Sequence, residues 1–195
     1  MSQDIKDAIL KACLPNVVFD GWTWEMVCKT TEDIGYSVNI ARGVFPEKMV
    51  SVLDHFADWA DRSMLAAMQD NDPQSMRVRD RIHHAVMTRL EILEPYKDAV
   101  GQSSHFWMLP SRKARALKIT WRTADVIWGW AGDQSTDYNR YTKRGLLSGV
   151  IASTMVFWIR DKSDDLDKSK AFLDRRIENV MQLGKFVQTL KSKVS

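Results

Sequence analysis

The sequence predicts an all-α protein of about nine helices, with a helix-turn-helix-like unit at its N-terminus. Over most of the 195 residues, apolar side chains recur at intervals of three and four, which is the period of an amphipathic helix. Pro, Gly and capping residues divide this pattern into segments of helical length. No segment shows the strict alternation of a half-buried strand, and no internal repeat is evident. Helices packed on helices around one core are therefore expected.

The N-terminal unit is predicted from its capping residues. Thr23 can cap a helix from Trp24 to about Ile34, because its hydroxyl can accept a hydrogen bond from the first turn. Gly35 is a suitable stop, since Gly adopts the left-handed conformation that ends helices. Ser37 can cap a short helix that ends before Pro46. A helix, a Gly turn and a short helix give the spacing of a helix-turn-helix unit.

Proline residues mark the breaks in the rest of the chain. Asn71-Asp72-Pro73 ends one long helix, and Pro95 interrupts the next. Ser111 can cap the helix after Pro110, and Asp137 lies in the first turn of a long apolar helix. Outside the N-terminal unit, helices are expected over residues 4–13, 47–68, 75–93, 96–109, 111–130, 137–160 and 168–191, with Val78, Ile82, Val86, Leu90 and Leu93 facing inward.

The composition indicates an unusually bulky apolar interior. Hydrophobic residues make up 45% and charged residues 27%, which is ordinary for a globular protein, but the chain also holds eight Trp and ten Met. Trp is large and flat, and Met fills irregular gaps. Together they suit a wide apolar interior, a binding groove or a membrane-facing patch. The alternative is simply a bulky core.

Targeting and membrane signals are weak. The most apolar run, Gly145 to Ile159, has fifteen residues and is shorter than the roughly 20 that cross a bilayer, so a buried core or dimer helix is expected. Cys13 and Cys28 form no metal-binding or redox motif and fit a reducing compartment. Asp4 and Asp7 argue against a signal or transit peptide. A cytosolic protein, or a mature form without its presequence, is expected.

The charge distribution argues against nucleic acid as a partner. Residues 1–72 hold six Lys and Arg against twelve Asp and Glu, a net charge of −6, whereas residues 73–195 carry +9. The second helix of the helix-turn-helix unit, from Ser37 to Phe45, offers only Arg42 to neutralise phosphates. A transcription regulator with an apolar effector pocket remains the alternative function.

No set of residues predicts an enzyme. The histidines at 55, 83, 84 and 105 form neither HxxxH nor HExxH, and Asp80-x-x-His83 lacks the second motif that a helical di-iron site needs. Nucleophile-elbow and phosphate-loop motifs are absent. We therefore predict no catalytic residue, no metal and no cofactor.

The segment from Pro110 to Trp130 is basic and rich in Trp and aliphatic residues, with Asp125 as its only acid. Such a helix suits an anionic membrane surface, and the apolar cluster 106–109 beside it favours an exposed patch. A solvated basic face above a core is the alternative. The candidate membrane-surface residues are Phe106, Arg112, Lys113 and Arg115.

The segment Ala131 to Arg144 is dense in polar and aromatic side chains. Asp133 and Asp137 can serve a helix N-terminus, and Ser135 and Thr136 can cap it. That leaves amphipathic aromatics and cations of the kind that is enriched at protein interfaces: Tyr138, Arg140, Tyr141, Lys143 and Arg144.

The sequence Trp128-Gly-Trp-Ala-Gly-Asp-Gln-Ser-Thr-Asp-Tyr-Asn-Arg-Tyr-Thr-Lys-Arg144 resembles the coenzyme Q (ubiquinone) biosynthesis accessory lipid-binding proteins, the Coq-nine type. Its AGDQSTD core followed by N-x-Y-T-[KR]-R is highly specific. Flanking pieces agree: Arg89-Leu-Glu-Ile-Leu-Glu-Pro-Tyr96, Met108-Leu-Pro110 and Phe172-Leu-Asp-Arg-Arg176. The match is good over roughly residues 85–185 and looser over the first 80.

The resemblance implies a single TetR-like domain over 1–195, forming a homodimer that has lost DNA binding. Residues 1–46 would be a degenerate helix-turn-helix region, and residues 47–195 the lipid-binding and dimerisation helices. It also implies an accessory, non-catalytic role. The family is thought to bind a quinone precursor or its isoprenoid tail and to present it to the demethoxyubiquinone hydroxylase. Phospholipid is a further candidate ligand.

Two sets of site residues follow from this resemblance and from the apolar pattern. The candidate lipid-binding residues are Trp107, Met108, Leu109, Trp121, Leu147, Ile151, Met155 and Phe172. The family's partner-binding patch corresponds to Asp125, Ile127, Trp128, Asp137, Arg140, Tyr141 and Arg144.

The sequence departs from the family in two respects. Arg140 stands where eukaryotic members carry Trp, and the chain stops at Ser195 without their amphipathic membrane-docking helix. The absence of a presequence suggests a bacterial member. We expect a cytoplasmic protein peripherally associated with the inner membrane, or with the matrix side of the mitochondrial membrane for a processed eukaryotic form.

Overall fold

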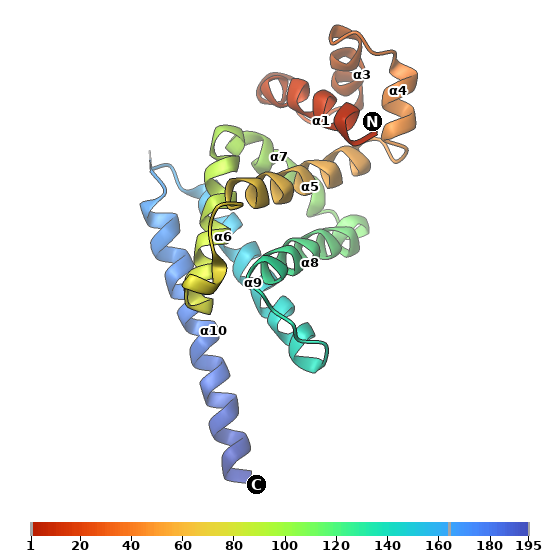
Figure 1. The fold of residues 1–195 in the computed structure, drawn as a ribbon. Coiled ribbons are helices and arrows are strands. Elements are labelled where there is room, and N and C mark those ends of the chain that lie inside the picture. The colour runs from red at the N-terminus through yellow and green to blue at the C-terminus, as the bar shows by residue number, and fades with distance from the viewer. Residues whose placement is uncertain (1, 164, 195) are drawn as a thin grey trace. The chain divides into compact units, whose positions relative to one another are not determined.

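The computed structural model describes residues 2–163 and 165–194, with side chains described as far as residue 182. Every regular element in these ranges is a helix, which confirms the all-α prediction (Figure 1). The internal contacts group the chain into two compact units. Unit 1 comprises Met1–Ala66 and Ile92–Ile119, and unit 2 comprises Ala67–Glu91 and Thr120–Ser195. The single-domain organisation with a boundary at residue 46 stays a prediction.

Unit 1 contains the predicted helix-turn-helix region. Thr23 caps α3 as expected, because its hydroxyl accepts a hydrogen bond from the Met26 amide at 3.2 Å. Gly35 has a positive φ of 84° and turns the chain towards α4, where Ser37 takes the N-cap position without a side-chain bond. The helices of this unit are α1 (Ser2–Cys13), α2 (Val17–Asp20), α3 (Trp24–Asp33), α4 (Val38–Val44), α5 (Met49–Ala67), α7 (Lys97–Trp107) and the first part of α8 (Lys113–Trp130).

A charged cluster ties α1 to α5 within unit 1. The Asp7 carboxylate accepts two hydrogen bonds from the Arg62 guanidinium, at 2.7 and 2.9 Å, and lies 2.8 Å from Nε2 of His55. Burial lowers the pKa of His55, although Asp7 opposes the shift. This Asp7 cluster therefore holds a neutral imidazole against a carboxylate.

Unit 2 is built on α6 (Val78–Leu93), the second part of α8, α9 (Tyr138–Arg160) and α10 (Asp167–Val194). Most of its predicted inward residues are buried, but Val78 is 51% exposed, so its assignment to the core is wrong. Val78 is the first residue of α6 and borders an open pocket, described below, instead of the packed core. Its core is made of Ile82, Val86, Leu90, Ala124, Ile127, Leu147, Val150, Ile151, Trp158, Leu173 and Ile177.

The helix boundaries mostly follow the predicted breaks. The Asp72 carboxylate accepts a hydrogen bond from the Gln74 amide and caps a 3-10 turn at Pro73–Ser75. Ser111 does not cap α8, contrary to the prediction, because it lies inside a second 3-10 turn at Pro110–Arg112. Among the described residues, no helix is both long enough and apolar enough to span a bilayer.

Candidate functional site

The loop between α8 and α9 is held by a network of charged side chains in unit 2. One oxygen of the Asp133 carboxylate accepts a hydrogen bond from Arg144 Nη1 at 2.7 Å. The other accepts from Lys143 Nζ at 2.6 Å and from the Ser135 hydroxyl at 2.8 Å. On its opposite side, Arg144 binds Asp125 through Nε at 2.5 Å. We call these residues (Asp125, Asp133, Ser135, Lys143 and Arg144) the Asp133 network.

The centre of this network is buried. The side chains of Asp133 and Arg144 are only 4% and 5% exposed. Desolvation disfavours the charged carboxylate, but the hydrogen bonds from Lys143, Arg144 and Ser135 outweigh it and hold the pKa of Asp133 well below its usual range. Desolvation likewise opposes the charge on Arg144, yet Asp125 and Asp133 raise its pKa. Asp133 and Arg144 therefore both stay ionised at neutral pH.

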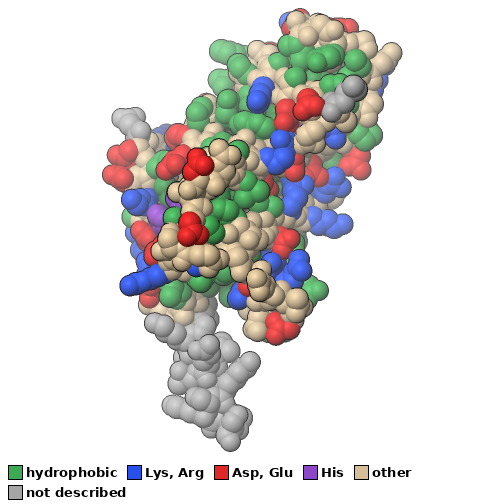
Figure 2. All heavy atoms as spheres, in the orientation of Figure 1, with side chains coloured by type: hydrophobic (Ala, Val, Ile, Leu, Met, Phe, Trp, Pro, Cys, Tyr) green, Lys and Arg blue, Asp and Glu red, His purple; other side chains and the backbone are tan. Residues whose placement is uncertain are grey.

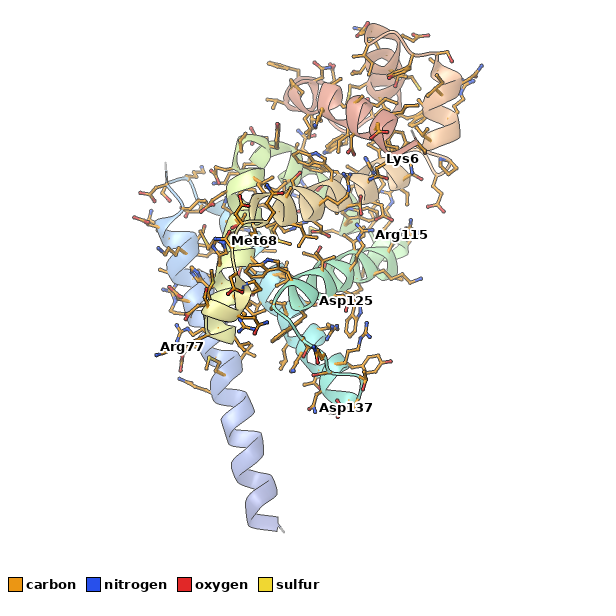
Figure 3. The ribbon with its side chains drawn as sticks, viewed as in Figure 1. Lys6, Met68, Arg77, Arg115, Asp125 and Asp137 are labelled. Atoms are coloured by element: carbon orange, nitrogen blue, oxygen red, sulfur yellow. The ribbon has the colours of Figure 1, made fainter. Side chains whose placement is uncertain are left out.

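The structure separates the roles of the two loop carboxylates. Asp137 is the N-cap of α9 and accepts a hydrogen bond from the Asn139 amide at 3.0 Å (Figure 3). The sequence position of Asp133 had indicated that it also serves this helix terminus. Instead, Asp133 binds side chains one turn or more inside α9. Ser135 bonds to Asp133 instead of capping. The loop is thus fastened to the side of α9.

A second anchor fixes the start of the loop. Arg81 of α6 donates from Nη1 to the Ala131 carbonyl at 2.6 Å and from Nη2 to the Gln74 side-chain oxygen at 3.3 Å. The next residue, Gly132, has a φ of 82°, and a Cβ there would lie 2.7 Å from the Gln74 amide nitrogen. Only a glycine satisfies both conditions without a shift of its neighbours.

The predicted partner-binding residues divide into an exposed and a buried group. Asp137, Arg140 and Tyr141 are exposed, Tyr141 by 63%, and the Tyr141 ring contacts Trp121. Ile127 and Arg144 are buried and therefore lie behind this surface. Arg140 pairs with Asp125 at 3.3 Å. Trp128 is half-buried, and its indole N–H donates to the Lys143 carbonyl at 3.1 Å.

An apolar pocket of about 250 Å³ lies in unit 2 beside the network. Its wall is almost wholly hydrocarbon, and Trp128 is its largest side chain. Two charged residues border it, Arg79 and Lys143, and both are paired with acids: Arg79 with Glu178 at 2.9 Å, and Lys143 with Asp133. The lining residues are Val78, Arg79, Ile82, Trp128, Lys143, Leu146, Leu147, Val150, Ile177, Val180 and Met181.

The predicted lipid-binding residues are spread over both units. Leu147 lines the apolar pocket, and Phe172 borders a second hollow, where its ring stacks on Phe157 at 4.4 Å. Ile151 is buried and Met155 is half-buried in unit 2. Trp121 is half-buried beside Tyr141, while Trp107, Met108 and Leu109 belong to unit 1.

Sequence reasoning missed most of the pocket. Its residues on α6 and α10 were treated as ordinary core, because a pocket wall and a filled core share the same apolar helical period. One signal was available: Lys143 follows Trp128 and Asp133 within the specific motif, and nothing in helix capping required it.

The predicted membrane-surface residues lie in unit 1, where Figure 2 shows Lys and Arg side chains gathered around the start of α8. Arg112 covers the Phe106 ring, with its guanidinium 3.5 Å from the ring centre, and Arg115 binds Asp54 at 2.6 Å. Lys113 is exposed. The neighbouring apolar residues Met108 and Leu109 are 69% and 48% exposed.

Within the described residues, no group of three or more His, Cys, Asp or Glu side chains is arranged to hold a metal ion. The Asp133 network consists of paired charges around one carboxylate. The network fixes the loop to α9 and places a charged side chain at the edge of the pocket, whose own surface is hydrocarbon.

The fold belongs to the TetR-like class of helical proteins. The structure matches the crystal structure of the TetR transcriptional regulator from Nitrosomonas europaea with a TM-score of 0.72 and 20% sequence identity, over 90% of this chain and 97% of that one. This confirms the predicted fold.

The sequence comparisons identify the particular relatives. The COQ9 family model matches residues 114–184. The chain is 28% identical over 197 residues to the rat "Ubiquinone biosynthesis protein COQ9, mitochondrial", 26% to the human protein and 29% over 183 residues to the Drosophila melanogaster protein. These matches confirm the resemblance to the Coq-nine type.

The relatives are longer than this chain. The alignments cover 97% of the chain and 63% and 62% of the rat and human proteins, so the chain spans less than two thirds of their length. The segment matched by the family model contains the whole Asp133 network and every residue of α8, α9 and α10 that lines the apolar pocket.

Proposed function

We propose that this protein is a lipid-binding accessory protein of ubiquinone biosynthesis. It binds an isoprenoid quinone precursor with its tail in the apolar pocket and presents it to the demethoxyubiquinone hydroxylase, without catalysing a reaction itself. The observation that carries the proposal is the hydrocarbon-lined pocket of about 250 Å³, whose wall is formed mainly by the segment that the COQ9 family model matches. We infer the pathway from the names of the relatives, which are ubiquinone biosynthesis proteins.

The chemistry of the pocket favours a neutral ligand. Burying one five-carbon isoprene unit contributes up to roughly 4 kcal/mol, at about 0.8 kcal/mol per CH₂-sized group, before the entropic costs of binding. The bordering cations Arg79 and Lys143 are already neutralised by Glu178 and Asp133. An anionic headgroup would have to displace these acids, so a neutral quinone is preferred over an anionic phospholipid.

Calorimetric titration with ubiquinone-2, a neutral quinone with two isoprene units, tests the proposal. Val180→Phe narrows the pocket and is expected to weaken binding at least about tenfold, a difference of about 1.4 kcal/mol. Leu117→Phe, at a site in unit 1 that is 71% exposed, serves as the matched control and should bind like the wild type. Absence of ubiquinone-2 binding to the wild type, or equal binding by both variants, would contradict the proposal. Lipid extraction followed by mass spectrometry identifies a co-purified phospholipid if that is the ligand instead.

The hydroxylase is proposed to dock on the exposed side chains around the start of α9. Tyr138 is 79% and Tyr141 63% exposed, and Asp137 and Arg140 are exposed beside them. Aromatic residues and Arg dominate the energetics of protein interfaces. In this proposal the buried residues Ile127 and Arg144 support the surface from behind.

We further propose a peripheral membrane contact and a homodimer. Met108, Leu109 and Lys113 combine exposed apolar area with positive charge and suit an anionic membrane surface, on the cytoplasmic side in a bacterium or the matrix side in a mitochondrion. Leu146 and Val156 of α9 are exposed apolar residues that a second copy could cover. Binding of nucleic acid is not proposed, since α4 presents Arg42 as its only cation.

A further inference from the structure

Two side chains connect the apolar pocket to the charged network that holds the loop between α8 and α9. Trp128 and Lys143 line the pocket. The Trp128 indole donates to the Lys143 carbonyl at 3.1 Å, and the Lys143 ammonium lies 5.4 Å from the centre of the Trp128 ring. The same ammonium binds Asp133 at 2.6 Å and Ser135 at 2.8 Å. One residue therefore touches hydrocarbon with its stem and the 131–137 loop with its head.

Lys143 can be contacted by a ligand in the pocket, because it is one of the lining residues. Its aliphatic stem packs along the apolar wall while the head reaches polar partners, as long cationic side chains commonly do. An unfilled apolar space leaves the wall side chains without dispersion partners on one side, so they gain little from holding their places. A hydrocarbon ligand supplies those partners and stabilises the arrangement of Trp128 and Lys143 seen here.

Arg144, the other cation on Asp133, has no such connection. It is buried and held between Asp125 and Asp133, and it does not line the pocket. Arg144 therefore fixes one oxygen of Asp133 whether or not a ligand is present. Lys143 and Ser135 hold the other oxygen, and of these only Lys143 borders the pocket.

We infer that Lys143 is a positioning residue that couples occupancy of the apolar pocket to the shape of the 131–137 loop. Filling the pocket fixes Lys143, Lys143 fixes the Asp133 side of the loop, and the loop sets the start of α9 where Tyr138 and Tyr141 are exposed. A partner that docks there would recognise the loaded protein in preference to the empty one. By linkage, docking would raise the affinity for the ligand by the same factor. The inference rests on the proposed lipid binding.

Hydrogen exchange of the loop amides, measured with and without ubiquinone-2, tests this coupling in the whole protein. In the wild type, the ligand is expected to slow exchange over residues 131–137 by about fivefold or more, the lower range of ordinary coupling between sites. Lys143→Met keeps an apolar wall but removes the ammonium. It is compared with the wild type at a ubiquinone-2 concentration that saturates both proteins, and the ligand-induced protection of the loop should disappear.

Two further variants separate coupling from stability. Lys143→Arg restores a cation of similar reach and should restore ligand-induced protection. Lys170→Met removes an exposed cation from α10 in the same unit and should leave that protection unchanged. Because the readout is the change caused by the ligand, a variant that merely loosens the loop does not imitate the expected result.

Three outcomes decide the question. Protection in the wild type that is lost in Lys143→Met and regained in Lys143→Arg supports the coupling. Ubiquinone-2 binding without any loop protection in the wild type overturns the coupling and leaves the proposed function standing. No ubiquinone-2 binding at all overturns both.

Discussion

Each unit of the molecule contains a carboxylate held by an arginine and a second basic side chain, but the two clusters lie in different surroundings. In unit 1, Asp7 binds Arg62 and His55 and joins α1 to α5. In unit 2, Asp133 binds Arg144 and Lys143 and fastens a loop to α9. The Asp7 side chain is 21% exposed and that of Asp133 only 4%. The first cluster joins two helices, whereas the second shares a residue with a pocket.

Similar charged clusters can therefore differ in their effect on ligand binding, because the residues around them differ. In the Asp7 cluster, His55 is buried in unit 1 and packs next to the Phe45 ring. In the Asp133 network, Lys143 lies beside the Trp128 ring and lines the apolar pocket. We therefore expect changes in the first cluster to affect stability alone, and changes in the second to affect stability and binding together.

The largest effect is expected from Arg144→Met. It leaves the buried Asp133 carboxylate with Lys143 as its only strong cation, and breaking a buried pair costs about 3 kcal/mol or more. Urea unfolding should show a midpoint lowered accordingly. Arg140→Met removes an exposed pair with Asp125 and should cost less than about 1 kcal/mol. Equal losses in both variants would show that the network is not buried in solution.

Asp7→Asn is expected to have a smaller effect, about 1–2 kcal/mol, because the charge-assisted hydrogen bonds it removes are partly exposed. Asp20→Asn, at an exposed position at the end of α2, is the control. Binding of ubiquinone-2 should be unchanged in Asp7→Asn. Loss of ligand affinity in this variant would contradict the purely structural role of the first cluster.

Acid should destabilise the two clusters in different pH ranges. The pKa of His55 is lowered in the folded state, so the unfolded state binds the proton first, and stability falls as the pH drops through about 6.5. The pKa of Asp133 is also depressed, so its contribution is present above about 3.9 and is lost only at lower pH. Thermal unfolding between pH 7.5 and 5.5 should therefore be less pH-dependent in His55→Gln than in the wild type. An unchanged pH dependence would remove His55 from this account.

The smallest effect on stability, within about 0.5 kcal/mol, is expected from Tyr141→Ala, because the ring is exposed. Its effect should appear instead as reduced recovery of the hydroxylase in a pull-down with purified proteins. Tyr36→Ala, in the loop before α4 of unit 1, provides a matched control that should recover the hydroxylase normally. Recovery unaffected by Tyr141→Ala would exclude this tyrosine from the docking surface.

The fold was largely predictable from the sequence because helix period, Pro breaks and caps act locally. Thr23, Gly35 and Asp72 end or begin elements as their side chains and backbone freedom dictate. Ser111 is not the cap of α8 because it lies inside a short 3-10 turn at Pro110–Arg112. Hydrogen bonds from the Arg112 and Lys113 amides to the Leu109 and Pro110 carbonyls form this turn, and residue preferences alone do not determine it.

The candidate site was predictable only in part. The motif around Asp133 pointed to the loop that the charged network holds, but the roles of Asp133 and Lys143 depend on which side chains converge from two helices and a loop. The pocket was harder still, since Leu147 alone among the predicted lipid-binding residues lines it. Whether apolar residues fill a space or enclose one depends on the distances between helices, which a sequence pattern does not encode.

Gly132 has a consequence for how sequences related to this one can vary at positions 74 and 132. Its positive φ and the 2.7 Å approach of the Gln74 amide mean that a side chain here meets both backbone strain and a neighbour. The approaching atom is the end of the flexible Gln74 side chain, which can move aside, so the backbone is the stricter constraint: only a residue tolerant of the left-handed region, such as Asn, would persist at position 132. Related sequences with a side chain at position 132 should therefore favour a short residue at position 74, which makes that movement unnecessary. Such covariation would record the contact between these two positions without any structure.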